Sequence, residues 1–557
     1  MAINRRNALG LLGLGGAAAV AGTAQARFVG WSFGHGVASG DPLSDRVILW
    51  TRVSPGEGQA TPAEVTWTVW ADKDRKSLVA TGKVTTDPSR DYTVKVDVTG
   101  LKPGRDYWYA FAAADGRSAL GRTRTLPTGK VKDVVLAAAN CALYPGGYYN
   151  AYQAIADLKR VDAVLFLGDY IYEYGPDAYG TKTGHALNRL ADPPHECITL
   201  DDYRIRLACH RADPQLQAAH ARAPWIVTWD DHETANDSWE HGAEDHQPKT
   251  EGDWDTRKAA AIKAFYEWMP IREPSDGSLF ASYRSFDFGD LASLIMTETR
   301  LTARTQQLTY AKDLTITDGK PDIEGFKVKW KDPERRMMSP AQEDWIGKQL
   351  SASVKAGHAW QVLGNQVVMA KIAAPDFAQK IGDEAWAATM AKLPDEYRGR
   401  VMRLSQLGKT GLPYNLDSWD GYPADRLRLY RAFKAANARP IVLSGDSHAF
   451  WANELHDEEG AGLLGAEFGV TGISSPGAGD VIKDAFLPEG FVETNDEVRF
   501  TDQAAKGFLL LTLTRDAAKG EMMAVSTIME QAFTTRVVKA YSVKHSKWGG
   551  VTPLEEV

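Results

Sequence analysis

Metal-capable side chains follow four apolar runs of the chain, each at the point where the run ends. They stand in "NC" (140–141), "GDYIY" (168–172), "WDDHE" (229–233) and "GDSH" (445–448). One polar residue at a strand end means little, because every strand must leave its sheet somewhere. Four such ends carrying Cys, Asp, Tyr or His predict one shared site, since ligands gather beyond the ends of strands in α/β folds.

These residues fall into two kinds of metal ligand. The soft, anionic set consists of Cys141, Tyr172 and His448, and it suits a ferric ion. The oxygen set, Asp231 and Asp446, suits a hard divalent ion such as Ca²⁺. The sequence therefore predicts a mixed centre.

The order and spacing of the four motifs resemble the metallophosphoesterase superfamily, whose motifs run D-x-H, G-D-x-x-D/Y, G-N-H-E and G-H-x-H. Cys141 stands near the first motif in place of Asp or His, and Tyr172 takes the variable place of the second. Asp231 replaces the Asn of the third motif, and Asp446 replaces the first His of the fourth. These departures resemble the PhoD-type alkaline phosphatases, as do "GVASGDP" (36–42), "VILWTRV" (47–53) and "DPQLQAAHARAPWIVTWDDHE" (213–233). The resemblance implies a phosphatase with one iron and two calcium ions.

Phosphate-ester chemistry gives the remaining residues their expected roles. Asp169, after the glycine of the second motif, is the expected bridge between metals. Two metals about 3.5–4 Å apart would clamp a phosphate ester, generate a hydroxide nucleophile and stabilise the leaving oxygen. His232 is expected to bind a phosphate oxygen or protonate the leaving group. Asn236 and Arg300 are expected to contact phosphate, although "ETRLTART" carries Glu298 where the family pattern has Asp. Asn365, in "VLGNQVV", is expected to face the metals.

Several of these residues also have a structural interpretation. Cys141 could be a small buried hydrophobe, Tyr172 a core aromatic, and Asn365 a packing residue. The chain has three cysteines, and an odd count in an oxidising compartment leaves at least one thiol unpaired. Cys197 and Cys209 could form a disulfide, which would leave Cys141 as the remaining thiol.

Two other function classes compete with the metal enzyme. "GDSH" could mark a serine hydrolase with Ser447 as nucleophile; that family carries the motif near the start of its domain, whereas here it is the last of four. A secreted binding protein with a relic metal site is disfavoured by intact motifs at every strand end. Within the enzyme class, monoesterase, diesterase and phospholipase D-type activities stay open.

The elements that must position these residues alternate between strands and helices from residue 129 to 557. Continuous apolar runs predict buried strands, and helices are expected around residues 146–161, 259–271 and 339–353, with a loop at 302–325. We expect an α/β (α+β) layered sheet-and-helix domain of the metallophosphoesterase kind over residues 129–557. Whether the segment 529–550 covers the site stays open.

Residues 27–128 predict a separate β-sandwich. "EVTWTVWAD" (64–72) and "YTVKVDVTGL" (92–101) alternate in polarity, as half-buried strands do. The series Gly-Leu-x-Pro-Gly followed by Tyr107 and Tyr109 resembles a fibronectin type III domain with its tyrosine corner.

Residues 1–26 predict a twin-arginine (Tat) export signal, with Arg5-Arg6, an apolar Gly/Ala-rich stretch and Ala24-Gln25-Ala26 for cleavage. The Tat machinery is the expected partner, and the mature protein is expected in the periplasm or outside the cell, without a transmembrane segment. The alternative is an uncleaved signal that acts as an N-terminal membrane anchor. The chain of 557 residues has a formal net charge of −8, which argues against non-specific nucleic-acid binding.

Overall fold

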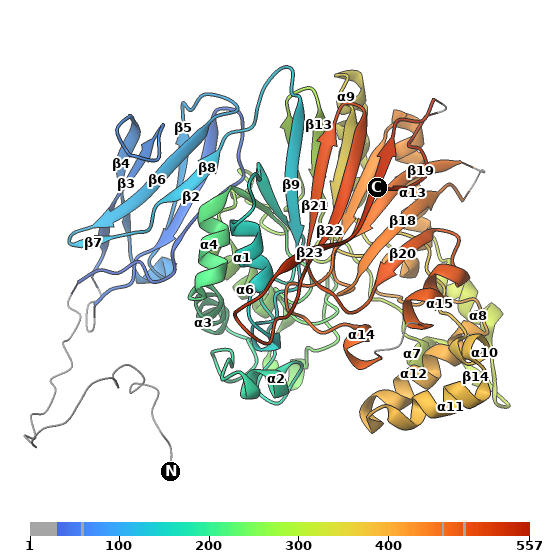
Figure 1. Cartoon of the computed structure of the whole chain (residues 1–557). Helices are drawn as coiled ribbons and strands as arrows, with labels where there is room; N and C mark the ends of the chain where they lie inside the picture. Colours follow the sequence, from blue (N-terminus) through green and yellow to red (C-terminus); the bar gives the residue numbers. More distant parts are fainter. Residues whose placement is uncertain (1–29, 57–60, 459–461, 483–485, 548) are drawn as a thin grey trace, which may run out of the picture.

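Two β-sheets packed face to face form the centre of the molecule, with helices on both outer faces (Figure 1). The computed structural model describes residues 30–56, 61–458, 462–482, 486–547 and 549–557. The predicted export signal lies outside these described residues. Among the helices of the described ranges, none combines the length and apolar character that a membrane crossing requires.

The larger sheet has ten strands and carries three of the four predicted motifs. Its spatial order is β24-β23-β22-β21-β9-β10-β11-β1-β2-β5, and β9, β10 and β11 run parallel. Every residue of β10 is buried, as its continuous apolar run predicts. The strands from β9 onward are β9 (Asp133–Ala139), β10 (Ala163–Phe166), β11 (Trp225–Val227), β21 (Lys506–Thr514), β22 (Ala517–Val525), β23 (Thr535–Lys544) and β24 (Glu555–Glu556). The segment 529–550 therefore contributes β23, near one edge of this sheet.

The second sheet has seven strands in the order β12-β13-β16-β17-β19-β18-β20 and carries the fourth motif after β17. β13, β16 and β17 are parallel neighbours. The strands are β12 (Arg284–Phe288), β13 (Ala292–Met296), β16 (Trp360–Gly364), β17 (Pro440–Ser444), β18 (Phe450–His456), β19 (Leu463–Gly469) and β20 (Val498–Asp502).

Alternate residues of β9 serve two different cores. Leu136 belongs to the buried cluster between the sheets, together with Leu294 and Val362 of the second sheet. Its neighbour Ala137 belongs to the cluster beneath the helices of the outer face. Successive side chains of a strand point to opposite faces. One face of β9 therefore packs against the second sheet, and its other face packs against the helices.

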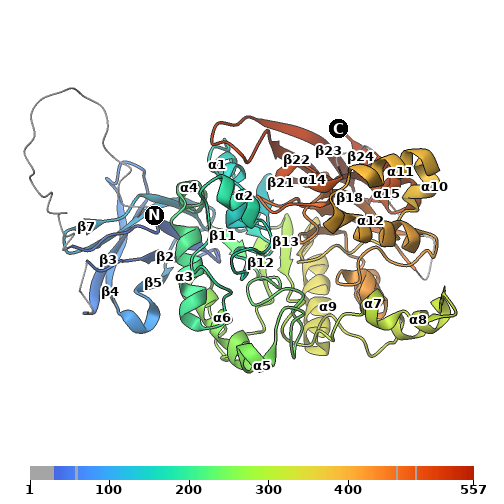
Figure 2. The same ribbon diagram turned by 90° about the horizontal axis from the view of Figure 1, so that it is seen from below.

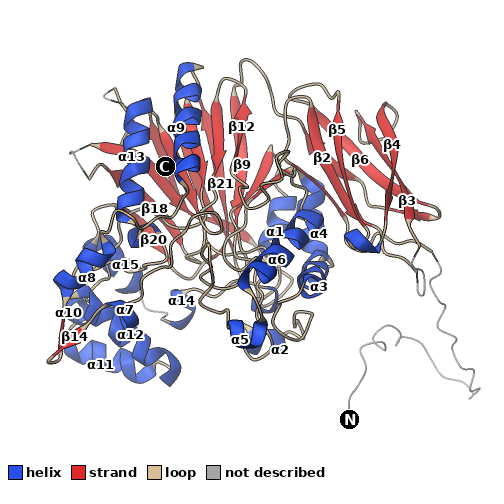
Figure 3. Ribbon diagram, turned by 180° about the vertical axis from the view of Figure 1, so that it is seen from behind, coloured by secondary structure: helices blue, strands red, loops and turns tan. Residues whose placement is uncertain are grey.

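Helices cover the outer face of each sheet (Figure 3). On the larger sheet these are α1 (Asn150–Ala156), α3 (Leu200–Arg211), α4 (Pro214–Arg222) and α6 (Trp254–Trp268), and on the second sheet α9 (Pro340–Lys355) and α13 (Pro423–Ala436). Ser339 caps α9 by accepting a hydrogen bond from the Gln342 backbone, and Pro340 follows at the first turn. The predicted helices are confirmed, although α1 is shorter than the span 146–161.

Further helices lie around the lower end of the sheets in Figure 1, among them α2, α12 and α14, and Figure 2 shows them from below. They are α2 (Thr181–Ala186), α5 (Pro248–Glu251), α8 (Ile323–Trp330), α10 (Phe377–Ile381), α11 (Asp383–Lys392), α12 (Asp395–Gly408), α14 (Ala478–Val481) and α15 (Phe486–Thr494). The prediction of a plain loop at 302–325 is wrong in part. That span contains α7 (Tyr310–Asp313) and a hairpin of β14 (Ile316–Thr317) and β15 (Lys320–Pro321). The hairpin turns at Asp318 and Gly319, which both adopt the left-handed conformation.

The N-terminal region is a β-sandwich. One layer contains β3 (Ala63–Trp70), β4 (Leu78–Thr86), β6 (Asp106–Ala113), β7 (Gly116–Arg117) and β8 (Gly121–Arg124), and the other contains β1 (Val37–Gly40), β2 (Arg46–Arg52) and β5 (Thr93–Thr99). Tyr107 and Tyr109 are buried between the layers. The Tyr107 hydroxyl accepts a hydrogen bond of 2.8 Å from the Lys102 backbone. This contact is the predicted tyrosine corner.

One layer of the sandwich is continuous with the larger sheet. β1 pairs with β11 in parallel, at Gly40 and Trp225. A side chain at Gly40 would place its Cβ 2.3 Å from the Pro270 carbonyl oxygen, so the close approach requires glycine. The fold class is as predicted. The sandwich and the region that follows it are joined by hydrogen bonds between β1 and β11 as well as by the chain itself. The boundary at residue 128 stays a prediction.

Candidate metal centre

The predicted metal-capable residues converge from both sheets. Cys141 follows β9, Asp169 follows β10 and Asp231 follows β11, all in the larger sheet. Asp446 and His448 follow β17 of the second sheet. The first three side chains are buried, whereas Asp446 and His448 are half-buried. The centre is therefore open to solvent on the side of the second sheet.

Four of these residues have left-handed backbone conformations. The φ angles are 55° at Cys141, 57° at Asp169, 62° at Asp446 and 53° at His448. Such conformations cost residues other than glycine roughly 1–3 kcal/mol each and cluster at functional sites. Gly168 has φ 117°, and a Cβ there would lie 2.4 Å from the Cβ of Asp230. The chain thus turns sharply after β9, β10 and β17, which directs these side chains inward.

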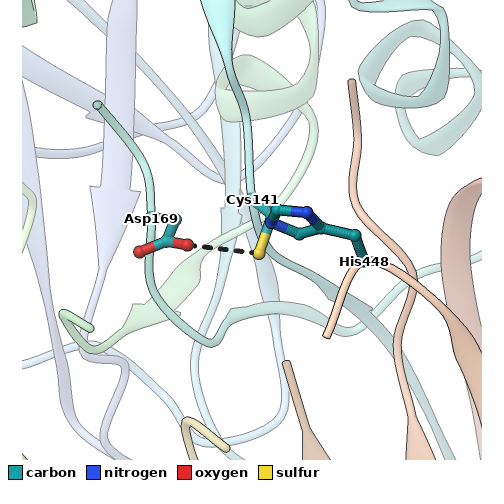
Figure 4. A group of neighbouring side chains, drawn as sticks. All are labelled: Cys141, Asp169 and His448. Carbon is teal, nitrogen blue, oxygen red and sulfur yellow. Dashed lines mark hydrogen bonds between the residues drawn. The ribbon is translucent and has the colours of Figure 1, made fainter. Parts of the chain in front are cut away.

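The first ligand group joins Cys141, Asp169 and His448 (Figure 4). The Cys141 Sγ lies 3.3 Å from Asp169 Oδ2. The Tyr172 hydroxyl lies 3.1 Å from the same oxygen and 3.1 Å from His448 Nε2. The Nδ1 of His448 lies 2.7 Å from the carbonyl oxygen of Pro476. Because a carbonyl only accepts, Nδ1 carries the hydrogen and Nε2 is left to bind a metal.

The second and third groups are rich in oxygen. One contains Asp169, Asp230, Asp231 and Asp446, and the other contains Asp169, Asp231 and His232, with one ligand atom of each residue within 4.8 Å of the others. Asp169 belongs to all three groups. The buried oxygens Asp169 Oδ1, Asp230 Oδ2 and Asp231 Oδ1 have no hydrogen-bond partner. Buried polar atoms are rarely left unpaired, so this donor set fits hard cations.

The electrostatics agree with a centre that needs cations. Burial raises the pKa of Asp169 well above its usual range, and the nearby charges of Asp231 and Asp230 add to this effect. Burial likewise raises the pKa of Asp230 to about 6, against the pull of Arg300. Burial also raises the pKa of the Cys141 thiol. A bound metal ion would reverse these effects, since it favours carboxylate and thiolate.

Arg300 is fully buried behind the aspartates. Its Nε donates to Asp230, its Nη1 donates to Asp417, and its Nη2 lies 3.6 Å from Asp231 Oδ1. Glu298 accepts the backbone N–H groups of Arg300 and Leu301, at 2.8 and 2.7 Å. Glu298, which stands where the family pattern has Asp, therefore stabilises the turn that carries Arg300.

His232 and Asn236 lie beside the centre. The His232 ring packs on Tyr172, with ring centroids 4.2 Å apart. Burial lowers its pKa, but the charges of Asp231 and Glu173 outweigh burial and raise the pKa well above the ordinary value. Asn236 is half-buried, four residues along the same turn.

Two of the predicted residues lie in less direct positions. The Asn365 side chain is buried, and its Oδ1 accepts a hydrogen bond of 3.1 Å from the Trp419 indole. Its Nδ2 donates to the Val367 carbonyl, so a place among the metal ligands stays a prediction. The hydroxyl of Ser447 lies 3.0 Å from the Trp451 indole nitrogen, which donates to it.

Sequence reasoning missed Asp230, Glu233 and Ser475. Asp230 stands beside Asp231 in "WDDHE", and the doubled aspartate was its only signal. Glu233 accepts the backbone N–H groups of Asp169 and Asp230, at 3.0 and 2.7 Å, and so fixes two strand ends together. Ser475 donates to the Tyr172 hydroxyl at 2.8 Å from a loop distant in sequence.

The three cysteines, all in the described part of the chain, are free thiols. The pairing of Cys197 with Cys209, which the sequence left open, is not formed in this structure. Burial raises the pKa of the Cys197 thiol to about 12, with weaker effects of nearby charges, so that thiol is unreactive.

Comparisons with known proteins agree with this geometry. The sequence model of the PhoD-like phosphatase family matches residues 136–522, and that of the family's N-terminal domain matches residues 17–127. Alkaline phosphatase D of Bacillus subtilis (strain 168) is 35% identical over 534 residues, covering 92% of this chain and 81% of that protein. A solved structure of PhoD matches with a TM-score of 0.75 and 32% identity, covering 94% of this chain and 92% of that one. The chain therefore belongs to the PhoD-like phosphatase family and is a phosphoesterase.

Proposed function

We propose that the chain is an exported phosphatase that hydrolyses phosphate monoesters, diesters or both, with one ferric ion and two calcium ions. The observation that carries this proposal is the set of three overlapping ligand groups that share Asp169. A carboxylate common to all three groups suits a bridge between neighbouring cations.

The iron assignment rests on the first ligand group. The Cys141 thiol and the Tyr172 hydroxyl contact one oxygen of Asp169, and the imidazole Nε2 of His448 contacts the Tyr172 hydroxyl. These donors suit ferric iron better than they suit calcium, which prefers oxygen ligands.

The calcium assignment rests on the unpartnered oxygens of Asp169, Asp230 and Asp231. Carboxylate oxygens gathered in an acidic cluster suit Ca²⁺. Asp446 completes this group, and Asn365 would add an amide oxygen if the Trp419 contact leaves its second lone pair free.

Bound metal ions would supply an activated water and positive charge for the phosphate oxygens. His232 is suited to donate a proton to the leaving oxygen as its bond to phosphorus breaks. Asn236 offers an amide donor at the half-buried side. Arg300 retains one nitrogen, Nη2, without a hydrogen-bond partner, and it is the donor we assign to a phosphate oxygen.

Export is the remaining part of the proposal. The twin arginine, the apolar stretch and the small-residue cleavage motif of residues 1–26 support a Tat signal and a periplasmic or secreted location.

A substrate panel combined with metal analysis tests the proposal. Turnover of aryl and alkyl phosphate monoesters, diesters and a phospholipid would be measured with the purified protein, before and after chelation. We expect turnover that chelation abolishes and that a serine-directed sulfonyl fluoride leaves unchanged. Full turnover by metal-free protein would contradict the proposal.

A further inference from the structure

Glu173 directs both of its carboxylate oxygens at the turn that carries His232 and Asn236. It follows Tyr172 in "GDYIYEYG" and has no solvent exposure. Its Oε2 lies 2.7 Å from His232 Nδ1, and its Oε1 accepts the Asn236 backbone N–H at 2.7 Å. A buried carboxylate is costly unless it is paired and hydrogen-bonded, and both of these partners belong to the turn beside the metal centre.

The contact with Glu173 fixes the His232 ring. Since the carboxylate takes Nδ1, the nitrogen that remains for the metal centre is Nε2. Tyr172 and Tyr174 pack against the ring, with centroids 4.2 and 5.1 Å away. A ring held at one nitrogen and packed against two aromatic side chains has little freedom to rotate.

Tyr174, the residue after Glu173, fixes the orientation of the Asn236 side chain. The Tyr174 hydroxyl donates to Asn236 Oδ1 at 3.2 Å. The amide oxygen is therefore engaged, and Nδ2 is the amide atom left to donate toward a bound phosphate. Consecutive residues of one strand-end segment thus orient both His232 and Asn236.

We propose that Glu173 is a positioning residue, which holds His232 Nε2 and the Asn236 amide in one fixed arrangement toward the leaving oxygen and the phosphate. This inference rests on the roles of His232 and Asn236 proposed above. Glu173 acts through His232. Removing the Glu173 carboxylate therefore slows most strongly the hydrolysis of esters whose leaving group needs a proton.

Two phosphate monoesters of different leaving group test the role. Glu173→Gln keeps the size of the side chain and removes its charge. We expect kcat to fall by about 10- to 100-fold, with a larger fall for an alkyl ester than for a nitrophenyl ester, whose leaving group departs without a proton. Metal content is expected to stay at the wild-type level.

The chain offers a matched control in Glu251. This carboxylate also approaches a histidine, His246, at 3.3 Å, and accepts a backbone N–H from Gln247 at 2.9 Å. Neither residue belongs to the three ligand groups. Glu251→Gln is expected to leave the ratio of alkyl to nitrophenyl turnover unchanged, even if it lowers stability.

A double-mutant cycle separates positioning from general structural support. In a His232→Ala background, Glu173→Gln should cost at most about twofold more, because contacting residues that act as a unit are not additive and the glutamine Oε1 can still accept the Asn236 backbone N–H. An equal loss in both backgrounds, or a loss that follows metal content, would overturn the proposal. If Glu173→Gln does not fold, Glu173→Asp carries the same test. A wild-type enzyme inactive on both esters would refute the proposed function instead.

Discussion

One oxygen of Asp169, Oδ2, lies 3.3 Å from the sulfur of Cys141, although the two residues leave different strands. The other oxygen, Oδ1, is buried without a partner. Asp169 therefore has one oxygen toward the thiol and phenol side of the centre and one free for another ligand. This relationship underlies the first three predictions.

Asp169→Asn is expected to lower turnover by at least about 100-fold, because an amide cannot bridge two cations as a carboxylate does. The metal-free variant should be no less stable than the metal-free wild type, since burial disfavours the charge that is removed. Turnover, metal content and thermal unfolding check this prediction. Wild-type activity with wild-type metal content would exclude the bridge.

A calcium-selective chelator is expected to inactivate the enzyme, because the oxygen ligands of Asp230 and Asp231 suit a hard ion. Added calcium should restore turnover, and added zinc should not. Recovery with zinc alone would show that the second kind of site is not a calcium site.

The purified enzyme is expected to be coloured. Phenolate and thiolate donate charge into Fe³⁺, and Tyr172 and Cys141 meet at Asp169. Tyr172→Phe should bleach or shift the visible band, and Cys141→Ser should shift it separately. The spectrum is read together with iron content, and a colourless, iron-free, fully active preparation would contradict the iron assignment.

Changing Arg5 and Arg6 to lysine is expected to keep the protein in the cytoplasm, because the Tat machinery reads the arginine pair and not merely its charge. Cell fractionation and immunoblotting measure the distribution. Unchanged export of the double variant would indicate another route.

Acid is expected to destabilise the fold through His220. Burial, aided by Arg211, holds the pKa of His220 well below the ordinary value, and Tyr170 and Trp225 contact the ring. Above pH ~6.5 the ring is neutral in both the folded and unfolded states, so it adds no pH dependence. Below pH ~6.5 His220 binds a proton in the unfolded chain but stays neutral in the folded protein. The free energy of unfolding therefore falls by up to about 1.4 kcal/mol per pH unit.

Denaturant unfolding between pH 7 and 5 checks this slope. His220→Gln should reduce the loss of unfolding free energy over that interval, whatever its effect on stability at pH 7. His185→Gln, at an exposed position, is the control. An unchanged slope in His220→Gln would place the acid sensitivity elsewhere.

The sequence predicted the residues at strand ends because their chemistry is local. An apolar run followed by Gly168-Asp169 or Gly445-Asp446 reveals both the strand and its ligand. It could not show that Asp230 also faces the centre, since that depends on how the chain leaves β11 after Val227.

Contributions from distant loops were also beyond sequence reasoning. Ser475 contacts Tyr172, and Asp417 contacts Arg300, from segments without a motif of their own. The same holds for Glu173. The sequence gives no sign of its role, which is indicated only by its contact with His232 in the structure. Hydrogen bonds between remote segments are set by tertiary packing, which leaves no periodic pattern.

The pairing of Gly40 with Trp225 has a consequence for engineering the protein. Removing the N-terminal region would uncover one side of β11, whose unpaired backbone N–H and C=O groups would form a new sheet edge. Exposed edges of this kind recruit strands from other molecules. A truncated enzyme would therefore be prone to aggregation even with every metal-capable residue in place, and the sandwich acts as an edge protector for the sheet that carries Cys141, Asp169 and Asp231.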